Sequence, residues 1–282
     1  MENFIKRLFF ILINLIPNKE LRHKLRDYYN KNCSTYYFVI DPSIIKKEVF
    51  LKNKDKYNTV VLGSSHCEYA FNPEFFDVPA FNFGLNSADN ITMYYIYKEL
   101  IKKSDIKNIV VMYDVFSKGS NNSARSDFRN GFLHQKYILG VNYEQSDKRI
   151  EKFCKKHAKK LLKSIDYEYS GYKKSDTDTL PTSNKDERCA IHLKLHNKPS
   201  KEIWIEKLAK ECNEDSKHLV LLLSPAQPCY KNKMPPMCDL FNDIITRMLS
   251  MSGLRGRVID FYSTDFFNNE SYWIDMDHLN NK

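Results

Sequence analysis

The chain has 282 residues, of which 42% are hydrophobic and 13% aromatic. This composition supplies a sizeable core and excludes a wholly disordered chain, and a content of only 8 Gly argues against a Gly-rich nucleotide-binding architecture. The net charge of +9 favours anionic partners. No zinc-finger, helix-turn-helix or RNA-binding signature accompanies that charge, so we expect no nucleic-acid partner.

The cysteine and histidine patterns predict neither disulfides nor a metal centre. There are seven cysteines, an odd number, and no two of them form a Cys-x-x-Cys pair. A reduced compartment suits such residues, which then act as small buried hydrophobes. His192 and His196 are four residues apart, but no third ligand accompanies them, so we expect no bound metal.

The N-terminal segment predicts a membrane-surface anchor. Residues 8–16 are apolar (LFFILINLI), Lys6 and Arg7 precede them, and Pro17 ends the run. Nine residues cannot span a bilayer, which takes roughly 20. An apolar stretch flanked by cations suits the anionic cytoplasmic leaflet, whereas the alternative is a terminal helix that docks on the core or on a partner subunit. We therefore expect residues 1–50 to form an amphipathic membrane-associating leader and helix.

Five short apolar runs predict β-strands. Several are continuous Val, Ile or Leu runs without polar alternation, which is typical of parallel strands buried on both faces. Helix-like stretches lie between them, so the pattern predicts an α/β fold with a flavodoxin-like, doubly wound sheet of about five parallel strands. The five runs are residues 59–62, 79–83, 109–113, 219–223 and 258–261, and the clearest helical stretches are 91–102 and 239–250.

A long interval separates the third and fourth predicted strands. We interpret residues 117–215 as a helical insertion in an α/β domain of residues 51–282, packed over the carboxyl edge of the sheet, where α/β proteins bind ligands. Helices are expected at 150–165 and 202–212, with a loop at 176–186. The first of these helices has a basic face, which is either solvated or a contact for an anion or a membrane.

The first predicted strand runs directly into a Gly-Ser-Ser turn at residues 63–65. A hydroxyl at this carboxyl end of the sheet points into the cleft, where backbone N–H groups face a developing negative charge. Serine needs a base to become a nucleophile. Ser65 is therefore a candidate nucleophile only if a histidine is found, and otherwise the turn is a helix N-cap.

Asp275 and His278 form an Asp-x-x-His pattern near the C-terminus. At this spacing the carboxylate can bond one imidazole nitrogen, which fixes the tautomer and leaves the other nitrogen free as a base. Asp277 is the rival carboxylate, although neighbouring side chains on an extended chain point apart. The alternative is a polar tail whose Asp and His cap an end.

A third motif, residues 81–87 (FNFGLNS), follows the second predicted strand. Gly84 allows close backbone approach, and the Asn86 amide can donate a hydrogen bond to an oxyanion. The alternative is an ordinary strand-exit turn.

Together these three motifs resemble the SGNH (GDSL-like) hydrolase superfamily, in particular the branch found among bacterial polysaccharide O-acetyltransferases and esterases. The resemblance covers residues 57–113 and 219–280. It implies that Ser65 is the nucleophile, that His278 is the base and that Asp275 orients the base.

The resemblance also implies an oxyanion hole made by the N–H groups of Ser65 and Gly84. The family's third block, Gly-x-Asn-Asp, is not found, because residues 111–116 read VMYDVF. Asn86 is the substitute that we expect for the missing asparagine.

The function implied is serine-dependent O-acyl transfer, above all O-acetyl transfer, or ester hydrolysis on a bacterial surface glycan or its precursor. No cofactor or metal is implied, although a donor such as acetyl-CoA would be a substrate. Residues 16–26 resemble the leader of several bacterial glycan-assembly proteins, glycosyltransferases among them. This second resemblance implies a nucleotide- or lipid-linked sugar substrate, and a bacterial cytoplasmic protein peripheral to the inner membrane face.

Two other functions stay open. One is a membrane-associated glycan-assembly protein that kept the fold and lost activity, which the missing third block favours. The other is a glycosyltransferase, although the Asp-x-Asp pattern at residues 176–178 falls in a polar loop. Of the residues beside Ser65, His66 is expected to have a core or capping role, and Cys67 is a weak alternative nucleophile.

Overall fold

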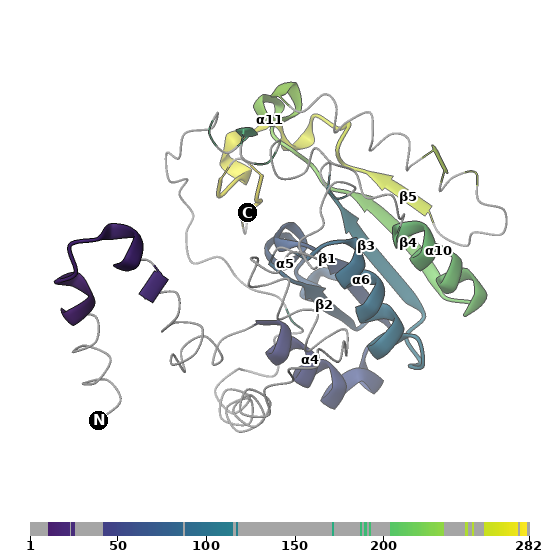
Figure 1. Ribbon diagram of the computed structural model, residues 1–282. Helices are drawn as coiled ribbons and strands as arrows, with labels where there is room; N and C mark the ends of the chain where they lie inside the picture. The colour runs from purple at the N-terminus through teal and green to yellow at the C-terminus, as the bar shows by residue number, and fades with distance from the viewer. Residues whose placement is uncertain are drawn as a thin grey trace. The chain divides into compact units, whose positions relative to one another are not determined.

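A computed structural model gives the fold of the protein (Figure 1). Two compact units are present: residues 1–41 with 147–161, and residues 42–146 with 162–282. The structure describes residues 11–22, 24–25, 42–86, 88–114, 117, 171, 187, 189–190, 192, 204–233, 246–247, 250, 257–275 and 277–280.

The larger unit contains a five-stranded sheet in which every strand pair is parallel. The strand order is β2-β1-β3-β4-β5, which is the order of flavodoxin-like sheets. β2 is added on one side of β1, whereas β3 and the later strands are added on the other side, so the switch point lies between β1 and β3. The strands are β1 (Thr59–Gly63), β2 (Ala80–Gly84), β3 (Asn108–Tyr113), β4 (His218–Leu223) and β5 (Arg257–Asp260). The predicted α/β class and all five predicted strands are thereby confirmed.

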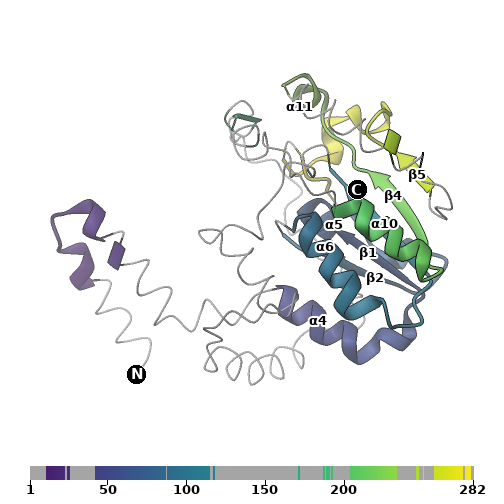
Figure 2. The ribbon, with the colours of Figure 1, turned by 45° about the vertical axis from the view of Figure 1, so that its right-hand side comes forward.

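Helices flank this sheet, as Figures 1 and 2 show. The α-helices are α4 (Pro42–Asn53), α5 (Ser65–Ala70), α6 (Asn90–Ile96), α10 (Trp204–Glu214) and α11 (Pro228–Lys233). One π-helical turn, η3 (Tyr97–Ile101), continues α6. Short 3-10 turns complete the described elements: η1 (Lys54–Lys56), η2 (Pro73–Phe75), η5 (Phe266–Asn268) and η6 (Glu270–Tyr272).

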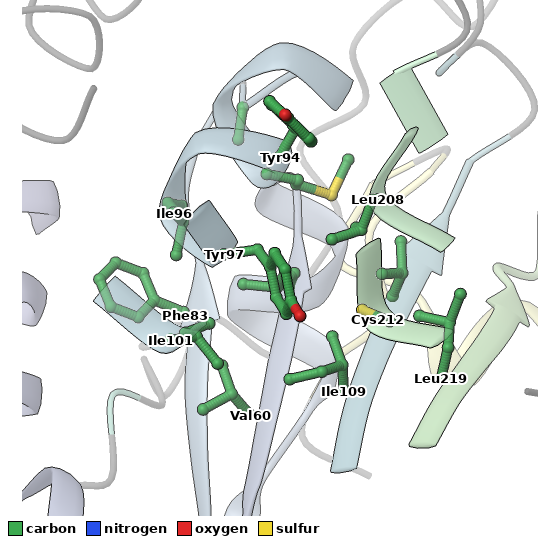
Figure 3. Packing of buried hydrophobic residues seen from close by; sticks show 14 of the residues in the cluster. Val60, Phe83, Tyr94, Ile96, Tyr97, Ile101, Ile109, Leu208, Cys212 and Leu219 are labelled. Carbon is green, nitrogen blue, oxygen red and sulfur yellow. The ribbon is translucent and has the colours of Figure 1, made fainter. Parts of the chain in front are cut away.

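The main core lies between one face of the sheet and α4, α6 and α10. Alternate residues of the strands point to this face, and in Figure 3 Val60, Ile109 and Leu219 meet Tyr97 and Cys212 from the helices. The strands have a side-chain period of two, so Val61, Val110 and their neighbours point to the opposite face. That face packs against Cys67 of α5, and the strands are therefore buried on both sides.

Side-chain caps fix the starts of the two helices that leave β1 and β2. Ser64 caps α5 by accepting a hydrogen bond from the His66 N–H. Asp89 caps α6 by accepting from both the N–H and the hydroxyl of Thr92, at 2.9 and 2.8 Å. Such caps satisfy N–H groups that have no partner inside the helix, and here they set where each helix begins relative to the carboxyl edge of the sheet.

Two predicted boundaries need correction. Phe50 of α4 is fully buried in the main core, so a division at residues 50/51 cuts through a helix that belongs to the α/β unit. Leu208 of α10 is in the same core, so the predicted insertion, 117–215, ends with a helix that covers the sheet. The predicted elements at 150–165 and 176–186 lie outside the described residues, as does most of 239–250.

In the smaller unit, residues 11–14, 19–22 and 24–25 are helical. Ile11, Leu12 and Leu15 are 57%, 55% and 72% exposed. Among the described helices, none has the length and apolar character needed to cross a membrane.

Candidate active site

The candidate site lies at the carboxyl ends of β1 and β3, where the strand order reverses. Open α/β sheets bind ligands at this switch point. β1 ends at Gly63, Ser64 caps the helix that follows, and Ser65 is its first residue. Ser65 is only partly buried.

Three predicted residues form a hydrogen-bonded chain. The Nε2 atom of His278 lies 2.8 Å from the Oγ atom of Ser65. The other ring nitrogen of His278, Nδ1, lies 2.9 Å from both carboxylate oxygens of Asp275. The three groups therefore have the relative geometry of a nucleophile, a base and the carboxylate that orients the base.

A compact turn presents this His–Asp pair. The Oδ1 atom of Asp275 accepts hydrogen bonds from the backbone N–H groups of Asp277 and His278, at 3.0 and 2.9 Å. Below the turn, Trp273 and Leu279 form an antiparallel bridge. Trp273 is 1% exposed and its indole N–H donates to the Phe267 carbonyl at 2.8 Å, so it packs beneath the turn.

Asp275 is ionised at neutral pH. Burial by itself raises the pKa of its carboxyl group, but the hydrogen bond and charge of His278 outweigh burial and bring the pKa below its ordinary value. An ionised carboxylate only accepts hydrogen bonds. It therefore holds the ring proton of His278 on Nδ1 and leaves Nε2 free to accept the Ser65 proton.

The His66 ring is stacked on the His278 ring, and both of its nitrogens face polar groups. Its Nδ1 atom is 2.9 Å from Ser64 Oγ and 3.2 Å from Asp114 Oδ2, and its Nε2 atom is 3.2 Å from Asp277 Oδ2. Burial lowers the pKa of His66, but Asp114 and Asp277 more than reverse this effect and raise the pKa to about 10. His66 is therefore a buried imidazolium between two carboxylates.

Asp114 organises the end of β3. It accepts from the hydroxyls of Ser64 and Ser224, each at 2.6 Å. Burial raises the pKa of Asp114, but the charge and hydrogen bond of His66 prevail and lower it overall. A residue at the position of the missing third block thus provides a carboxylate that joins β1, β3 and β4.

A metal ion could in principle use this cluster, since donor atoms of His66, Asp277 and His278 lie within 4.8 Å of one another. However, the two imidazole rings are stacked with an interplanar angle of 8°. Their nitrogen lone pairs lie in the ring planes and do not converge on one point. The nitrogens of His66 already face Ser64, Asp114 and Asp277. Those of His278 already face Asp275 and Ser65. This arrangement does not fit a tetrahedral metal site.

The predicted oxyanion role of Gly84 is wrong in this structure. Its N–H donates to the Oδ1 atom of Asn82 at 2.7 Å and is therefore not directed at a substrate. The Asn82 amide also donates to the carbonyls of Cys67 and Phe71, at 2.9 and 2.7 Å. Asn82 thus links the end of β2 to α5 by hydrogen bonds, and the N–H of Gly84 donates to the same side chain.

Gly84 instead permits close packing of β2 on α5. A Cβ atom at this position would lie 2.5 Å from the Glu68 backbone nitrogen and 2.9 Å from Asn82 Oδ1. The buried ammonium of Lys46, on α4, donates to the Gly84 carbonyl and forms an ion pair with Glu68 at 3.3 Å. The third motif therefore has a packing function that the sequence did not reveal.

Among the described residues, a backbone group and a side chain at this edge concern the oxyanion. The N–H of Ser65 lies in the first turn of α5, where backbone N–H groups have no partner inside the helix. Asn86 is exposed in the turn after β2, on the same carboxyl edge.

Cys67 is unsuited to nucleophilic chemistry. Its side chain is 0% exposed and its thiol donates to Asn82 Oδ1 at 3.4 Å. Burial raises the pKa of the thiol far above its ordinary value, so it stays protonated. Cys67 is thereby excluded as the alternative nucleophile. The Asp-x-Asp pattern at residues 176–178, on which the glycosyltransferase alternative depends, lies outside the described residues.

Comparison of the chain with protein-family models, curated proteins and solved structures gave no match. The interpretation of the site therefore depends on its geometry and on the chemistry of its residues.

Proposed function

We propose that the protein is an SGNH-type serine esterase or O-acyltransferase, with Ser65 as nucleophile, His278 as base and Asp275 as the residue that orients the base. The observation that carries this proposal is the continuous chain from Ser65 Oγ through His278 to Asp275, with donor–acceptor distances of 2.8 and 2.9 Å.

In the first half-reaction, the Ser65 oxygen attacks the acyl carbonyl carbon while its proton passes to His278 Nε2. The tetrahedral intermediate then breaks the bond to the leaving alcohol or thiol, which takes that proton from His278. In the second half-reaction, His278 removes a proton from water or from a sugar hydroxyl. The resulting oxygen attacks the acyl group, and Ser65 regains its proton as the product leaves.

The negative charge of the intermediate needs donors at the carboxyl edge of the sheet. We assign this role to the N–H of Ser65 and to the Asn86 amide, since the Gly84 N–H is engaged by Asn82. Preorganised donors of this kind contribute about 3–4 kcal/mol each to transition-state stabilisation.

A bacterial surface glycan or its precursor is the proposed acceptor or ester substrate, with a donor such as acetyl-CoA for the transferase. The exposed apolar residues Ile11, Leu12 and Leu15, followed by Lys19 and Arg22, support peripheral attachment to an anionic inner-membrane surface. A nucleotide- or lipid-linked sugar would be encountered at that surface.

A fluorophosphonate probe tests the nucleophile directly. We expect the wild-type protein to be labelled on Ser65, and Ser65→Ala to abolish labelling without loss of folding. Ser263→Ala is the matched control, because Ser263 is exposed in the loop after β5, and it should be labelled as wild type. Wild-type protein that is folded but never labelled would contradict the proposal.

The second candidate function is an inactive assembly protein. The observation that favours it is the engaged Gly84 N–H, together with a carboxylate, Asp114, at the strand end where the related family has a donor. A protein that binds glycan precursors but neither reacts with fluorophosphonate nor hydrolyses aryl acetates would support this candidate over the enzyme.

A further inference from the structure

The ring of the base, His278, is stacked on a second histidine. The centroids of the His66 and His278 rings are 4.6 Å apart with an interplanar angle of 8°, and the Tyr69 ring approaches His278 edge-on at 5.8 Å. Both neighbours come from α5, the helix that begins with Ser65. The nucleophile and the surface that holds its base are therefore built on the same short helix.

Hydrogen bonding requires a proton on each ring nitrogen of His66. The Ser64 hydroxyl donates its proton to Asp114 at 2.6 Å, so it can only accept from His66 Nδ1. On the other side of the ring, Nε2 faces the carboxylate of Asp277 at 3.2 Å, which is also an acceptor. His66 is 5% exposed, so its ring nitrogens face these acceptors and not bulk solvent.

Several charged or titratable groups surround the two rings. Asp114, at the end of β3, and Asp277, in the C-terminal turn, face His66, while Asp275 and Asp277 face His278. His192 reaches the same cluster, with its Nδ1 atom 3.9 Å from Asp277 and 2.5 Å from the Tyr230 hydroxyl. The carboxylates lie at the edges of the rings, and His66 is the positive group that is stacked on the His278 ring.

We propose that His66 is a positioning residue for the base: a fixed imidazolium that holds the plane of the His278 ring and sets a positive charge against its face. A protonated His278 would place a second positive charge against the first, in an interior where screening is weak. The proposed base accepts the Ser65 proton through a ring nitrogen that carries no proton of its own, so a charge that opposes a second positive charge on this ring suits that role. The catalytic consequence rests on the proposed function, whereas the electrostatic effect is a property of the folded protein.

Ring-proton NMR titration of the histidines tests the electrostatic effect without any need for activity. His66→Gln removes the charge but keeps a polar group, His66→Lys restores a positive charge without the ring, and His278→Gln assigns the signal. His218→Gln is the matched control, because His218 is exposed at the first residue of β4, at the opposite edge of the sheet.

We expect the titration midpoint of His278 to rise by about one pH unit or more in His66→Gln, as expected for an unscreened neighbouring charge. It should stay within about 0.3 units of wild type in His66→Lys and in His218→Gln, which would mark the charge as the cause. An unchanged or lowered midpoint in His66→Gln overturns the proposal, as does loss of a ring proton from wild-type His66 below about pH 8.

Two further readouts complete the test. If neither His66 variant folds, the wild-type titration decides, because retention of both ring protons above about pH 8 supports the proposal.

Where the protein reacts with fluorophosphonate, the acidic limb of the labelling rate should move to higher pH in His66→Gln. A merely structural role would lower the rate equally at all pH values. Absence of labelling in wild type contradicts the proposed function and leaves the NMR result to decide the role of His66.

Discussion

Replacing Asp275 by Asn tests how the site sets the tautomer of its base. In Asp275→Asn the amide oxygen keeps the two backbone hydrogen bonds from Asp277 and His278, now 3.0 and 2.9 Å, so the turn is retained. The amide NH₂ then occupies the position of Oδ2, which lies 2.9 Å from His278 Nδ1. An NH₂ group donates, so it favours the tautomer in which Nδ1 accepts and Nε2 carries the proton, in competition with the amide oxygen, which also lies 2.9 Å from Nδ1.

A proton on Nε2 prevents His278 from accepting the Ser65 proton. The corresponding change in serine proteases lowers kcat by about 10⁴, so we expect fluorophosphonate labelling to slow by about 10³ to 10⁴. That loss corresponds to about 4–6 kcal/mol of transition-state stabilisation, at about 1.4 kcal/mol per factor of ten. The rate constant for loss of unlabelled protein, followed by intact-protein mass spectrometry at neutral pH, gives this quantity directly.

The matched control is Asp265→Asn. Asp265 is exposed, and its Oδ1 atom accepts from the Asn268 side chain, an interaction that the amide oxygen preserves. This variant should be labelled within about twofold of wild type, since no catalytic group depends on it. Folded Asp275→Asn that keeps more than a tenth of the wild-type rate would show that Asp275 does not set the tautomer.

Three further predictions concern stability and reactivity. Gly84→Ala should lower the free energy of unfolding in urea by about 3 kcal/mol, because its Cβ would lie 2.5 Å from the Glu68 backbone nitrogen; a loss under about 0.5 kcal/mol would refute this. The pKa of His66 is raised from 6.5 to about 10, so the folded state holds a proton that the unfolded state releases. The free energy of unfolding should therefore fall by a few kcal/mol as pH rises from about 6.5 to about 10, and an equal fall in His66→Gln would contradict this origin. Iodoacetamide followed by peptide mapping should modify Cys67 only after unfolding, since burial keeps its thiol protonated; rapid modification of the native protein would exclude that reasoning.

The sheet could be predicted because each strand has a recognisable pattern of apolar residues within its own short sequence. A run such as Val60-Val61-Leu62 is apolar at every position, which only a strand buried on both faces requires, and the structure buries all five residues of β1. The boundary at residue 50 was wrong because the apolar residues of α4 do not follow a strong helical pattern. What identifies α4 as part of the sheet's cover is the packing of Phe50 against Phe81 and Phe83.

The site was only partly predictable for a related reason. Ser65, Asp275 and His278 follow predicted strands with a spacing that has chemical meaning, so their proximity could be expected. The partners of His66 could not, since Asp114 and Asp277 reach it only through the folded chain. The error at Gly84 arose because one side chain, Asn82, competes for the N–H group, and nothing in the sequence distinguishes this use from the alternative.

The position of β3 at the centre of the sheet also governs how the chain folds. β3 pairs on one side with β1, about 50 residues earlier, and on the other with β4, about 110 residues later. Pairing over such distances closes a long loop and is slow. Until β4 arrives, the apolar edge of β3 is unpaired and can template pairing with another chain. Aggregation during synthesis should therefore compete chiefly with this step, and Ser65 and Asp114 will be in place before His278 can join them.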